Sequence, residues 1–202
     1  MTEIDFFLDF YSPYSYLASH RIAAIADKYH CKINYFPIDI KRTKLAVGNT
    51  GPATVEIPKK LRYMIVDLQR WADRYGLPLG RAQRADYSRI NKGLLLAKDR
   101  GAEPEYVRHA YDLVWGQSKN PDDDDVLSGL ARSLGWNSGE LLAYVSSKAA
   151  ADLYESVFER AVEKGVFGVP FFAIDDQAWW GNDRLFLVEE YLGGKRFGAD
   201  GG

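Results

Sequence analysis

DFYSPYSYLASHRI, residues 9–22, marks the place where a short strand gives way to a helix. The run IDFFLDF at 4–10 alternates apolar residues with others, which is the spacing of a strand with one buried face. Ser12 suits the N-cap of a helix and Pro13 its first residue, because proline has no backbone N–H to leave unpaired. Apolar residues at helical spacing then predict a helix that runs to about Lys28.

A second apolar run follows this helix. CKINYFPI, residues 31–38, predicts a strand with Pro37 near its end or in a bulge. Strand, helix and strand within about 40 residues form a βαβ unit, whose strands are parallel and whose crossover is right-handed.

Strand character returns only near the C-terminus. VPFFAID at 169–175 and AWW at 178–180 predict two strands joined by a turn. RLFLVEEYL at 184–192 predicts a last helix, with Asn182 or Asp183 as its cap.

The middle of the chain is helical in pattern. From about residue 55 to residue 164 the apolar positions recur every three or four residues, which predicts five or six helices and no strand. The resulting order is that of an α/β protein with a thioredoxin-like fold interrupted by an all-helical insertion domain. We expect residues 1–45 and 163–202 to form the thioredoxin-like domain, and residues 46–162 to form the helical domain.

Composition excludes several classes of function. The 202 residues carry 26 basic and 28 acidic side chains, a net charge of −2, which argues against a nucleic-acid or anionic membrane surface. No run approaches the roughly 18–20 apolar residues that span a bilayer, and no basic region precedes an apolar core as in a secretory signal. We therefore expect a cytoplasmic protein.

Cysteine and histidine usage excludes further chemistry. The single cysteine, Cys31, cannot form an internal disulfide, a cysteine-based zinc cluster or a dithiol redox pair. The three histidines have no metal-ligand spacing, so we expect no metal site.

Five blocks of sequence carry a family resemblance. They are DFYSPYSYLA, PIDIKRTKLAVGNTGP, VDLQRWADRYGLPL, VFGVP and WWGNDRLFLVE, in this order between about residues 4 and 192. They resemble the 2-hydroxychromene-2-carboxylate isomerases, glutathione-dependent enzymes of bacterial aromatic catabolism related to kappa-class glutathione transferases and DsbA-like folds. The resemblance implies reduced glutathione as cofactor, a small aromatic carboxylate as substrate and a homodimer.

Ser12 is the candidate catalytic residue. From its position alone it is an ordinary helix cap, although a helix start also favours an anion, and the hydroxyl could donate a hydrogen bond to a thiolate. The resemblance places the family's serine on Ser12 and the thiol on the ligand. No His or Lys lies at a recognisable base spacing, so a hydrogen-bonding role is favoured over nucleophilic attack.

Two further segments are candidates for glutathione contacts. On base rates Val169-Pro170 is a trans bond opening a strand, and WWGNDRL reads as strand, turn, cap and helix without a ligand. The resemblance implies a cis-proline loop facing the first helix, where the backbone of Val169 pairs with the cysteinyl part of glutathione. It also implies glutathione contacts at four residues toward the γ-glutamyl end: Trp180, Gly181, Asn182 and Asp183. Asp183 would take the ammonium group.

Substrate contacts are expected in the loop after the second strand and beyond. The resemblance makes Lys44 the anchor of the substrate carboxylate, with Asn49 nearby. The family has an Asn-Arg pair and later a Tyr at registers that hold Thr54, Val55 and Ala85 here. These contacts are therefore missing or supplied from elsewhere, by Arg81 or Arg84, and the departure concerns the substrate more than the cofactor.

The resemblance implies that the protein interconverts 2-hydroxychromene-2-carboxylate and trans-o-hydroxybenzylidenepyruvate by reversible addition of the glutathione thiolate. Two alternatives stay open. A kappa-like glutathione transferase would use the same cofactor site but leave the electrophile attached. A non-catalytic binding module of thioredoxin fold would have no affinity for glutathione, and Ser12→Ala would cost it only a cap, about 1 kcal/mol.

Overall fold

A mixed four-stranded sheet forms the centre of the molecule in the computed structural model, which describes residues 1–196. The strand order is β2-β1-β3-β4, with β1 parallel to β2 and antiparallel to β3, and β3 antiparallel to β4. The predicted βαβ start and the two C-terminal strands are thereby confirmed. The strands are β1 (Glu3–Leu8), β2 (Lys32–Pro37), β3 (Phe171–Ile174) and β4 (Gln177–Trp180).

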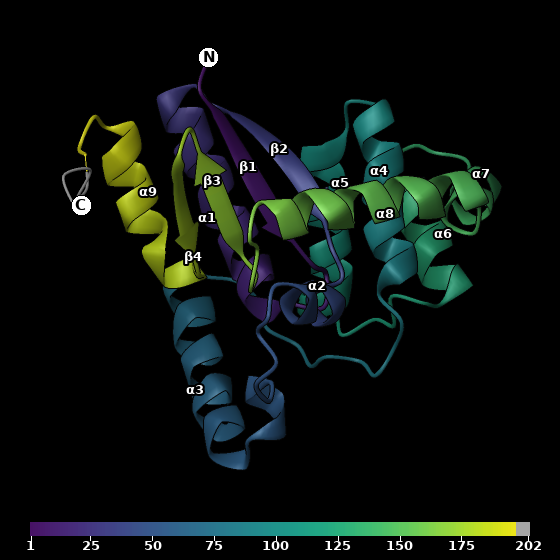
Figure 1. The fold of residues 1–202 in the computed structure, drawn as a ribbon. Coiled ribbons are helices and arrows are strands. Elements are labelled where there is room, and N and C mark those ends of the chain that lie inside the picture. The colour runs from purple at the N-terminus through teal and green to yellow at the C-terminus, as the bar shows by residue number, and fades with distance from the viewer. Residues whose placement is uncertain (197–202) are drawn as a thin grey trace.

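Helices cover both faces of this sheet (Figure 1). Alternate residues of β1 point to opposite faces, so Phe6 joins the core on the side of α1 (Pro13–Tyr29). Phe7 joins a second core cluster with Val157 and Ala161 on the other side. Those two residues belong to α8 (Lys148–Glu163), which crosses in front of the sheet in the figure.

The insertion between β2 and β3 is helical, as the sequence predicts, and contains no strand. Between residues 55 and 164 six α-helices occur, α3 to α8, which confirms the predicted five or six. A π-helical segment, Asp112–Gly116, continues α5. The remaining bounds are α3 (Pro58–Tyr75), α4 (Ser88–Asp99), α5 (Glu103–Tyr111), α6 (Asp124–Ser133) and α7 (Ser138–Val145).

Two local predictions are wrong. The segment after β2, expected as a loop, begins with the short helix α2 (Ile40–Ala46), which is too brief to show a periodic pattern and is capped by Asp39. The last helix is not capped by a side chain: a 3₁₀ turn at Asn182–Arg184 leads into α9 (Leu185–Leu192) without a side-chain cap. Asn182 and Asp183 use their side chains elsewhere, as described below.

The two predicted domains share one core. The largest cluster of buried apolar residues joins β1, α1 and β3 to α4, α5, α6 and α7. The boundaries at residues 45/46 and 162/163 stay predictions, and residues 197–202 of the second segment lie outside the described part. In the described part, no helix is both long and apolar enough to cross a bilayer.

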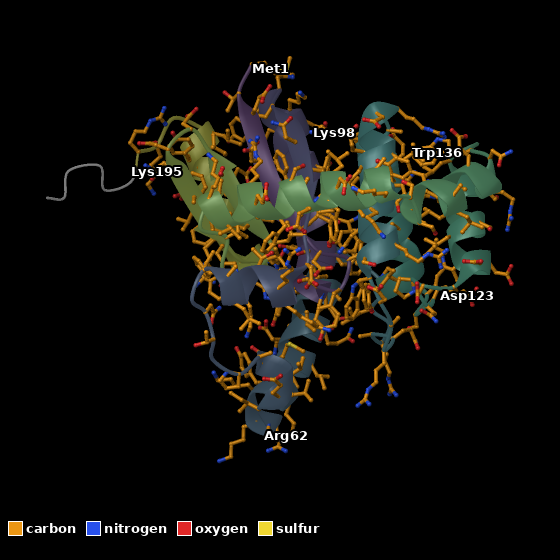
Figure 2. All side chains as sticks on the ribbon, turned by 45° about the vertical axis from the view of Figure 1, so that its right-hand side comes forward. Met1, Arg62, Lys98, Asp123, Trp136 and Lys195 are labelled. Atoms are coloured by element: carbon orange, nitrogen blue, oxygen red, sulfur yellow. The ribbon has the colours of Figure 1, made fainter. Side chains whose placement is uncertain are left out.

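Helix α3 projects from this body (Figure 1), and Figure 2 labels Arg62 near its outer end. Three apolar or aromatic side chains on it are about half exposed or more: Tyr63 (64%), Ile65 (57%) and Val66 (49%).

Candidate active site

Ser12 lies at the start of α1, where the chain leaves the carboxyl end of β1. Its Oγ accepts a hydrogen bond from the N–H of Ser15 at 3.2 Å, and its own N–H donates to the carbonyl of Asp9 at 2.8 Å. No described residue accepts the hydroxyl proton of Ser12. The serine is thus a helix cap with a donor to spare, at a helix start that favours negative charge.

The peptide bond between Val169 and Pro170 is cis, the form that the family resemblance implied, and it comes directly before β3. Phe7 of β1 is opposite Phe171 of β3. Val169 and Pro170 therefore lie at the end of the sheet from which β1 runs on to Ser12. In the described part of the chain, neither the N–H nor the C=O of Val169 has a hydrogen-bond partner, which leaves both for an extended ligand.

Trp180 forms a wall beside this loop. A methyl group on Gly168 would lie 2.4 Å from Nε1 of Trp180, so the indole ring packs directly on the glycine backbone. The rings of Trp180 and Phe167 meet edge to face, 5.1 Å between centroids, and both are close to half exposed. An exposed aromatic pair thus flanks the cis bond.

Gly181, Asn182 and Asp183 follow β4 at the same end of the sheet. The N–H of Gly181 donates to the carbonyl of Pro170 at 2.9 Å and so ties this turn to the cis-proline loop. Asn182 is buried; its Oδ1 accepts from the hydroxyl of Tyr75 at 3.3 Å, whereas its Nδ2 has no partner among the described residues. Asp183 pairs with the next residue along the chain.

Three tyrosine hydroxyl groups connect α3, and Pro78 just after it, to α1 and to Asn182. Tyr14 donates to Asp67 at 2.8 Å, Tyr16 donates to the carbonyl of Pro78 at 2.8 Å, and Tyr75 donates to Asn182. Burial, helped by the hydrogen bond to Asp67, holds the pKa of Tyr14 well above its ordinary value, so the hydroxyl stays a donor. Helix α3 therefore forms a side of the site next to the first turn of α1.

Asp9 is a buried acid that the sequence analysis did not single out. Its carboxylate accepts from the N–H of Tyr11 at 3.0 Å, the N–H of Ile40 at 3.0 Å and Nδ2 of Asn91 at 3.1 Å. Burial raises the pKa of Asp9 to about 6, against the opposing effect of these donors. The acid fastens the loop before Ser12 to α2 and α4.

Two of the predicted substrate contacts, Lys44 and Asn49, lie in α2 and in the turn directly after it. Lys44 lies in α2 rather than in a loop, and its Nζ donates to the carbonyl of Gly51 at 2.8 Å. Nδ2 of Asn49 donates to the carbonyl of Phe167 at 3.1 Å, which brings Asn49 close to the cis-proline loop.

The other predicted substrate contacts are less closely gathered. Thr54 and Val55 are exposed in a 3₁₀ turn, Thr54–Glu56, before α3. Arg84 is exposed between α3 and α4, and no hydrogen bond or ion pair joins it to another described residue. Ala85, beside it, is partly buried and lines a small hollow.

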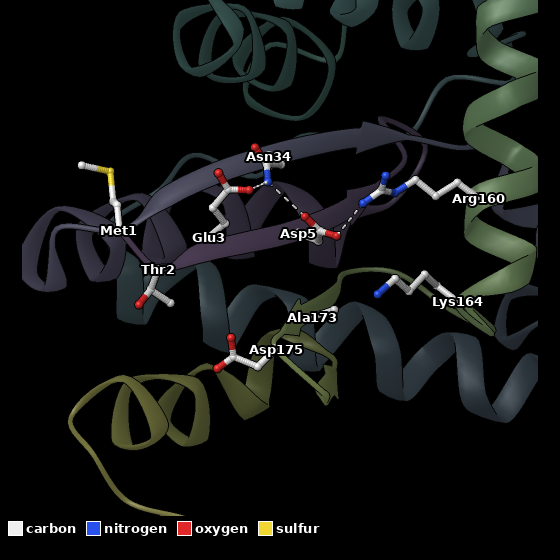
Figure 3. Close-up of a pocket in the computed structure, with 9 residues that line it drawn as sticks. All are labelled: Met1, Thr2, Glu3, Asp5, Asn34, Arg160, Lys164, Ala173 and Asp175. Atoms are coloured by element: carbon white, nitrogen blue, oxygen red, sulfur yellow. Dashed lines mark hydrogen bonds and ion pairs between the residues drawn. The ribbon is translucent and has the colours of Figure 1, made fainter.

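One surface hollow adjoins the loop before Ser12, and a larger one lies far from it. The Tyr11 hollow, about 80 Å³, adjoins the Ser12 loop and is lined by residues that include Asp9, Tyr11, Lys41, Ala85, Tyr87 and Asn91. A larger one, about 520 Å³, lies at the other end of β1 (Figure 3). Its charges largely satisfy one another, since Arg160 pairs with Asp5 at 3.0 Å and Asn34 donates to Glu3 and Asp5.

Comparisons with known proteins identify the fold and the family of the chain. The DsbA-like thioredoxin domain family matches residues 3–193. A 2-hydroxychromene-2-carboxylate isomerase of Pseudomonas sp. (strain C18) is 40% identical over 95% of this chain and 90% of its own length. A solved structure of a 2-hydroxychromene-2-carboxylate isomerase has a TM-score of 0.88 at 39% identity, over 95% of this chain and 94% of that one.

More distant relatives share the fold. Glutathione S-transferase kappa 1 of Caenorhabditis elegans is 22% identical over 95% of this chain and 91% of its own length. The cytosolic disulfide reductase DsbM from Pseudomonas aeruginosa, solved with GSH, has a TM-score of 0.65 at 15% identity, over 95% of this chain and 96% of that one. The family match over residues 3–193 and the relatives at about 40% identity show that the chain belongs to the DsbA-like thioredoxin domain family and, within it, to the 2-hydroxychromene-2-carboxylate isomerases.

Proposed function

We propose that this protein is a glutathione-dependent isomerase that interconverts 2-hydroxychromene-2-carboxylate and trans-o-hydroxybenzylidenepyruvate. The observation that carries the proposal is the position of Ser12, at the start of α1, at the same end of the sheet as the Val169–Pro170 loop. The family membership supplies the reaction, and this arrangement supplies a place for a thiol-bearing peptide.

The residues present suit glutathione at three points. Ser12 has a hydroxyl proton to donate, and Val169 offers a backbone N–H and C=O that no described residue pairs with. Nδ2 of Asn182 is a buried donor without a partner among residues 1–196, the kind of group that a nearby carboxylate would satisfy. We assign the γ-glutamyl end to the segment Trp180–Asp183 and the cysteinyl part to Val169.

When bound, glutathione supplies a thiol nucleophile that adds reversibly to the substrate and leaves again. Ser12 stabilises negative charge at the start of α1 by hydrogen bonding, and the backbone N–H groups of the first turn act in the same direction. No described His or Lys contacts Oγ of Ser12, so nothing activates the hydroxyl as a nucleophile. We therefore assign Ser12 a hydrogen-bonding role.

The proposal includes a homodimer in the cytoplasm. The homodimer is supported by the exposed side chains of Tyr63, Ile65 and Val66 on the projecting helix α3, which a second copy of the chain could cover.

The test is a titration of the ultraviolet absorbance of the glutathione thiolate in the presence of protein. We expect the wild type to show a bound thiol with a pKa clearly below that of free glutathione, and Ser12→Ala to lose that shift. Ser147→Ala is the matched control, because Ser147 caps α8 through the N–H of Ala150 at 3.1 Å and is a cap outside the site. Each variant should lose about 1 kcal/mol of stability.

If no bound thiolate forms at saturating glutathione, the proposal is wrong and the binding-module alternative gains. A shift lost equally in both variants would also contradict it, because a general loss of helix stability would then explain the effect of Ser12→Ala.

A kappa-like glutathione transferase is the second candidate. It is favoured by Thr54, Val55 and Ala85, which stand where the isomerases have polar and aromatic substrate contacts, and by the kappa-class relative. Free glutathione measured during turnover separates the two, since an isomerase leaves its concentration unchanged and a transferase depletes it.

A further inference from the structure

Asn182 is a buried amide of which only one end is bonded. The residue is 2% exposed, and its Oδ1 accepts from the hydroxyl of Tyr75 at 3.3 Å. Its Nδ2 has no hydrogen-bond partner in the described part of the chain. Because buried donors in folded proteins are nearly always bonded, Nδ2 marks a place for an acceptor that a ligand brings.

This amide lies beside the elements that carry the proposed thiol site. Gly181, directly before it, donates its N–H to the carbonyl of Pro170 at 2.9 Å, in the loop before β3. The 3₁₀ turn Asn182–Arg184 lies beside α1. In the first turn of α1, burial and its hydrogen bond to α3 raise the pKa of Tyr14, and the charge of Asp183 adds to this rise. The amide is therefore close both to the loop before β3 and to the start of α1.

Tyr75 is the residue that orients this amide. It is the last residue of α3, which Gly76 ends in the left-handed conformation with φ 66°, and its ring packs on Trp71, 5.6 Å between centroids. Burial raises the pKa of Tyr75, so the hydroxyl keeps its proton at neutral pH and donates it to Oδ1. No other described residue forms a hydrogen bond with the side chain of Asn182, so this one bond decides which end of the amide is free.

The free end of the amide selects the kind of group that it binds. Nδ2 only donates, so it fits a carboxylate and not an ammonium group. Without the hydroxyl of Tyr75 the amide can turn over and present Oδ1, because the last torsion of asparagine is broad and roughly two-fold. An acceptor would then face the carboxylate and weaken its binding.

We infer that Tyr75 is a positioning residue for glutathione: it holds the amide of Asn182 so that Nδ2 binds the carboxylate of the γ-glutamyl end. This inference rests on the proposed isomerase function and adds the last turn of α3 to the cofactor site. A carboxylate bound at Nδ2 polarises the amide and strengthens the hydrogen bond that Oδ1 accepts, so the ligand and the end of α3 support each other.

The experiment measures the Kd of glutathione by calorimetry for the wild type, Tyr75→Phe, Asn182→Ala and the double variant. Loss of the bond that orients the donor should raise the Kd of Tyr75→Phe about three- to tenfold. In the Asn182→Ala background the same substitution should change the Kd less than about twofold, because no amide is left to orient. A merely structural effect on α3 would persist in that background.

A shorter ligand gives an independent readout. Cysteinylglycine has the thiol of glutathione but lacks the γ-glutamyl carboxylate, so Tyr75→Phe should bind it as well as the wild type does. This comparison needs no change at Asn182 and stays decisive if Asn182→Ala folds poorly. Tyr14→Phe is the matched control, because the hydroxyl of Tyr14 holds α3 through Asp67 instead, and it should weaken glutathione binding less than Tyr75→Phe does.

The outcomes separate this inference from the proposed function. A Kd of Tyr75→Phe equal to that of the wild type, or an effect of the same size in the Asn182→Ala background, would overturn the role of Tyr75 and leave the isomerase proposal intact. Equal weakening of cysteinylglycine, or equal weakening of glutathione by Tyr14→Phe, would have the same consequence. A wild type that binds no glutathione would overturn both.

Discussion

Asp9 shows how a single buried residue holds together the elements around Ser12. It is 3% exposed, and three N–H donors from the Ser12 loop, α2 and α4 converge on its carboxylate. No residue near it in sequence reveals this role, because Asn91 lies more than eighty positions away. The buried acid therefore links the geometry of the Ser12 loop to pH.

The pH dependence of stability follows from the raised pKa of Asp9. The folded state holds the proton up to about pH 6, whereas the unfolded chain releases it near 3.8, so the folded state binds more protons between these values. The contribution of Asp9 is thus greatest below about pH 4 and falls by about 3 kcal/mol as pH rises through 6. Urea unfolding of wild type and Asp9→Asn from pH 4 to 7 measures it.

In this experiment the difference in unfolding free energy between wild type and variant should shrink as pH rises. A difference that does not change with pH would show that Asp9 keeps the same charge in both states.

Gly168 provides a second test at the level of one residue. A β-carbon there would lie 2.4 Å from Nε1 of Trp180, so Gly168→Ala must displace the indole or the loop. We expect a loss of about 1–3 kcal/mol in unfolding free energy and weaker glutathione binding by calorimetry. Gly129→Ala is the control: its β-carbon would meet only Arg132 at 3.9 Å, and alanine inside α6 should stabilise by about 0.5–1 kcal/mol.

At the scale of elements, α3 is positioned by polar contacts as well as by packing. Only Leu68 and Ala72 are buried on this helix of 18 residues. Met64, Trp71 and Tyr75 pack partly buried against the core, and the hydrogen bonds of Tyr14 and Tyr75 add to this contact. A helix that is mostly exposed opens more easily than the core helices do.

Tyr14→Phe should loosen α3. Loss of the hydrogen bond to Asp67 costs about 1 kcal/mol, which corresponds to roughly fivefold faster hydrogen exchange of the α3 amides. Tyr63→Phe, on an exposed residue of the same helix, should leave exchange unchanged. Equal exchange in both variants would mean that packing alone holds the helix.

The elements that the sequence predicts best are those with a local pattern. Alternating apolar residues predict β1, the Ser-Pro pair predicts the start of α1, and regular apolar spacing predicts the insertion helices. Helix α2 is too short to show a period, and the side chain of Asn182 bonds with Tyr75 instead of capping α9.

The same distinction applies to the candidate site. Its two ends, around Ser12 and Val169, carry motifs that can be recognised in the sequence. Asp9 and Tyr14 carry none, because their partners are set by how the chain folds back on itself rather than by neighbouring residues.

At the scale of the whole molecule, Asn91 of α4 connects the helical insertion to the segments that follow β1 and β2. This buried amide accepts from the N–H of Phe10 at 3.2 Å, and donates to Asp9, to the carbonyl of Ile38 and to Tyr154. It stands in the helical insertion and bonds to the thioredoxin-like half, and the main apolar core extends across both.

We therefore predict one cooperative unfolding transition in calorimetry, without separate melting of the insertion. Asn91→Ala should lower the midpoint of that one transition by leaving buried partners unpaired, at a cost of roughly 3 kcal/mol. Two resolved transitions in the wild type would show that the halves are energetically independent.

The arrangement of the sheet also has a consequence for synthesis on the ribosome. β1 lies between β2 and β3, but β3 begins only at Phe171. At about 5–20 residues per second, the nascent chain carries one unpaired edge of an apolar strand for roughly 10 to 30 seconds. During this interval the Ser12 end has been made while the Val169–Pro170 end has not, so the two ends of the candidate site meet late, and until then the open edge of β1 is a template for pairing with other chains.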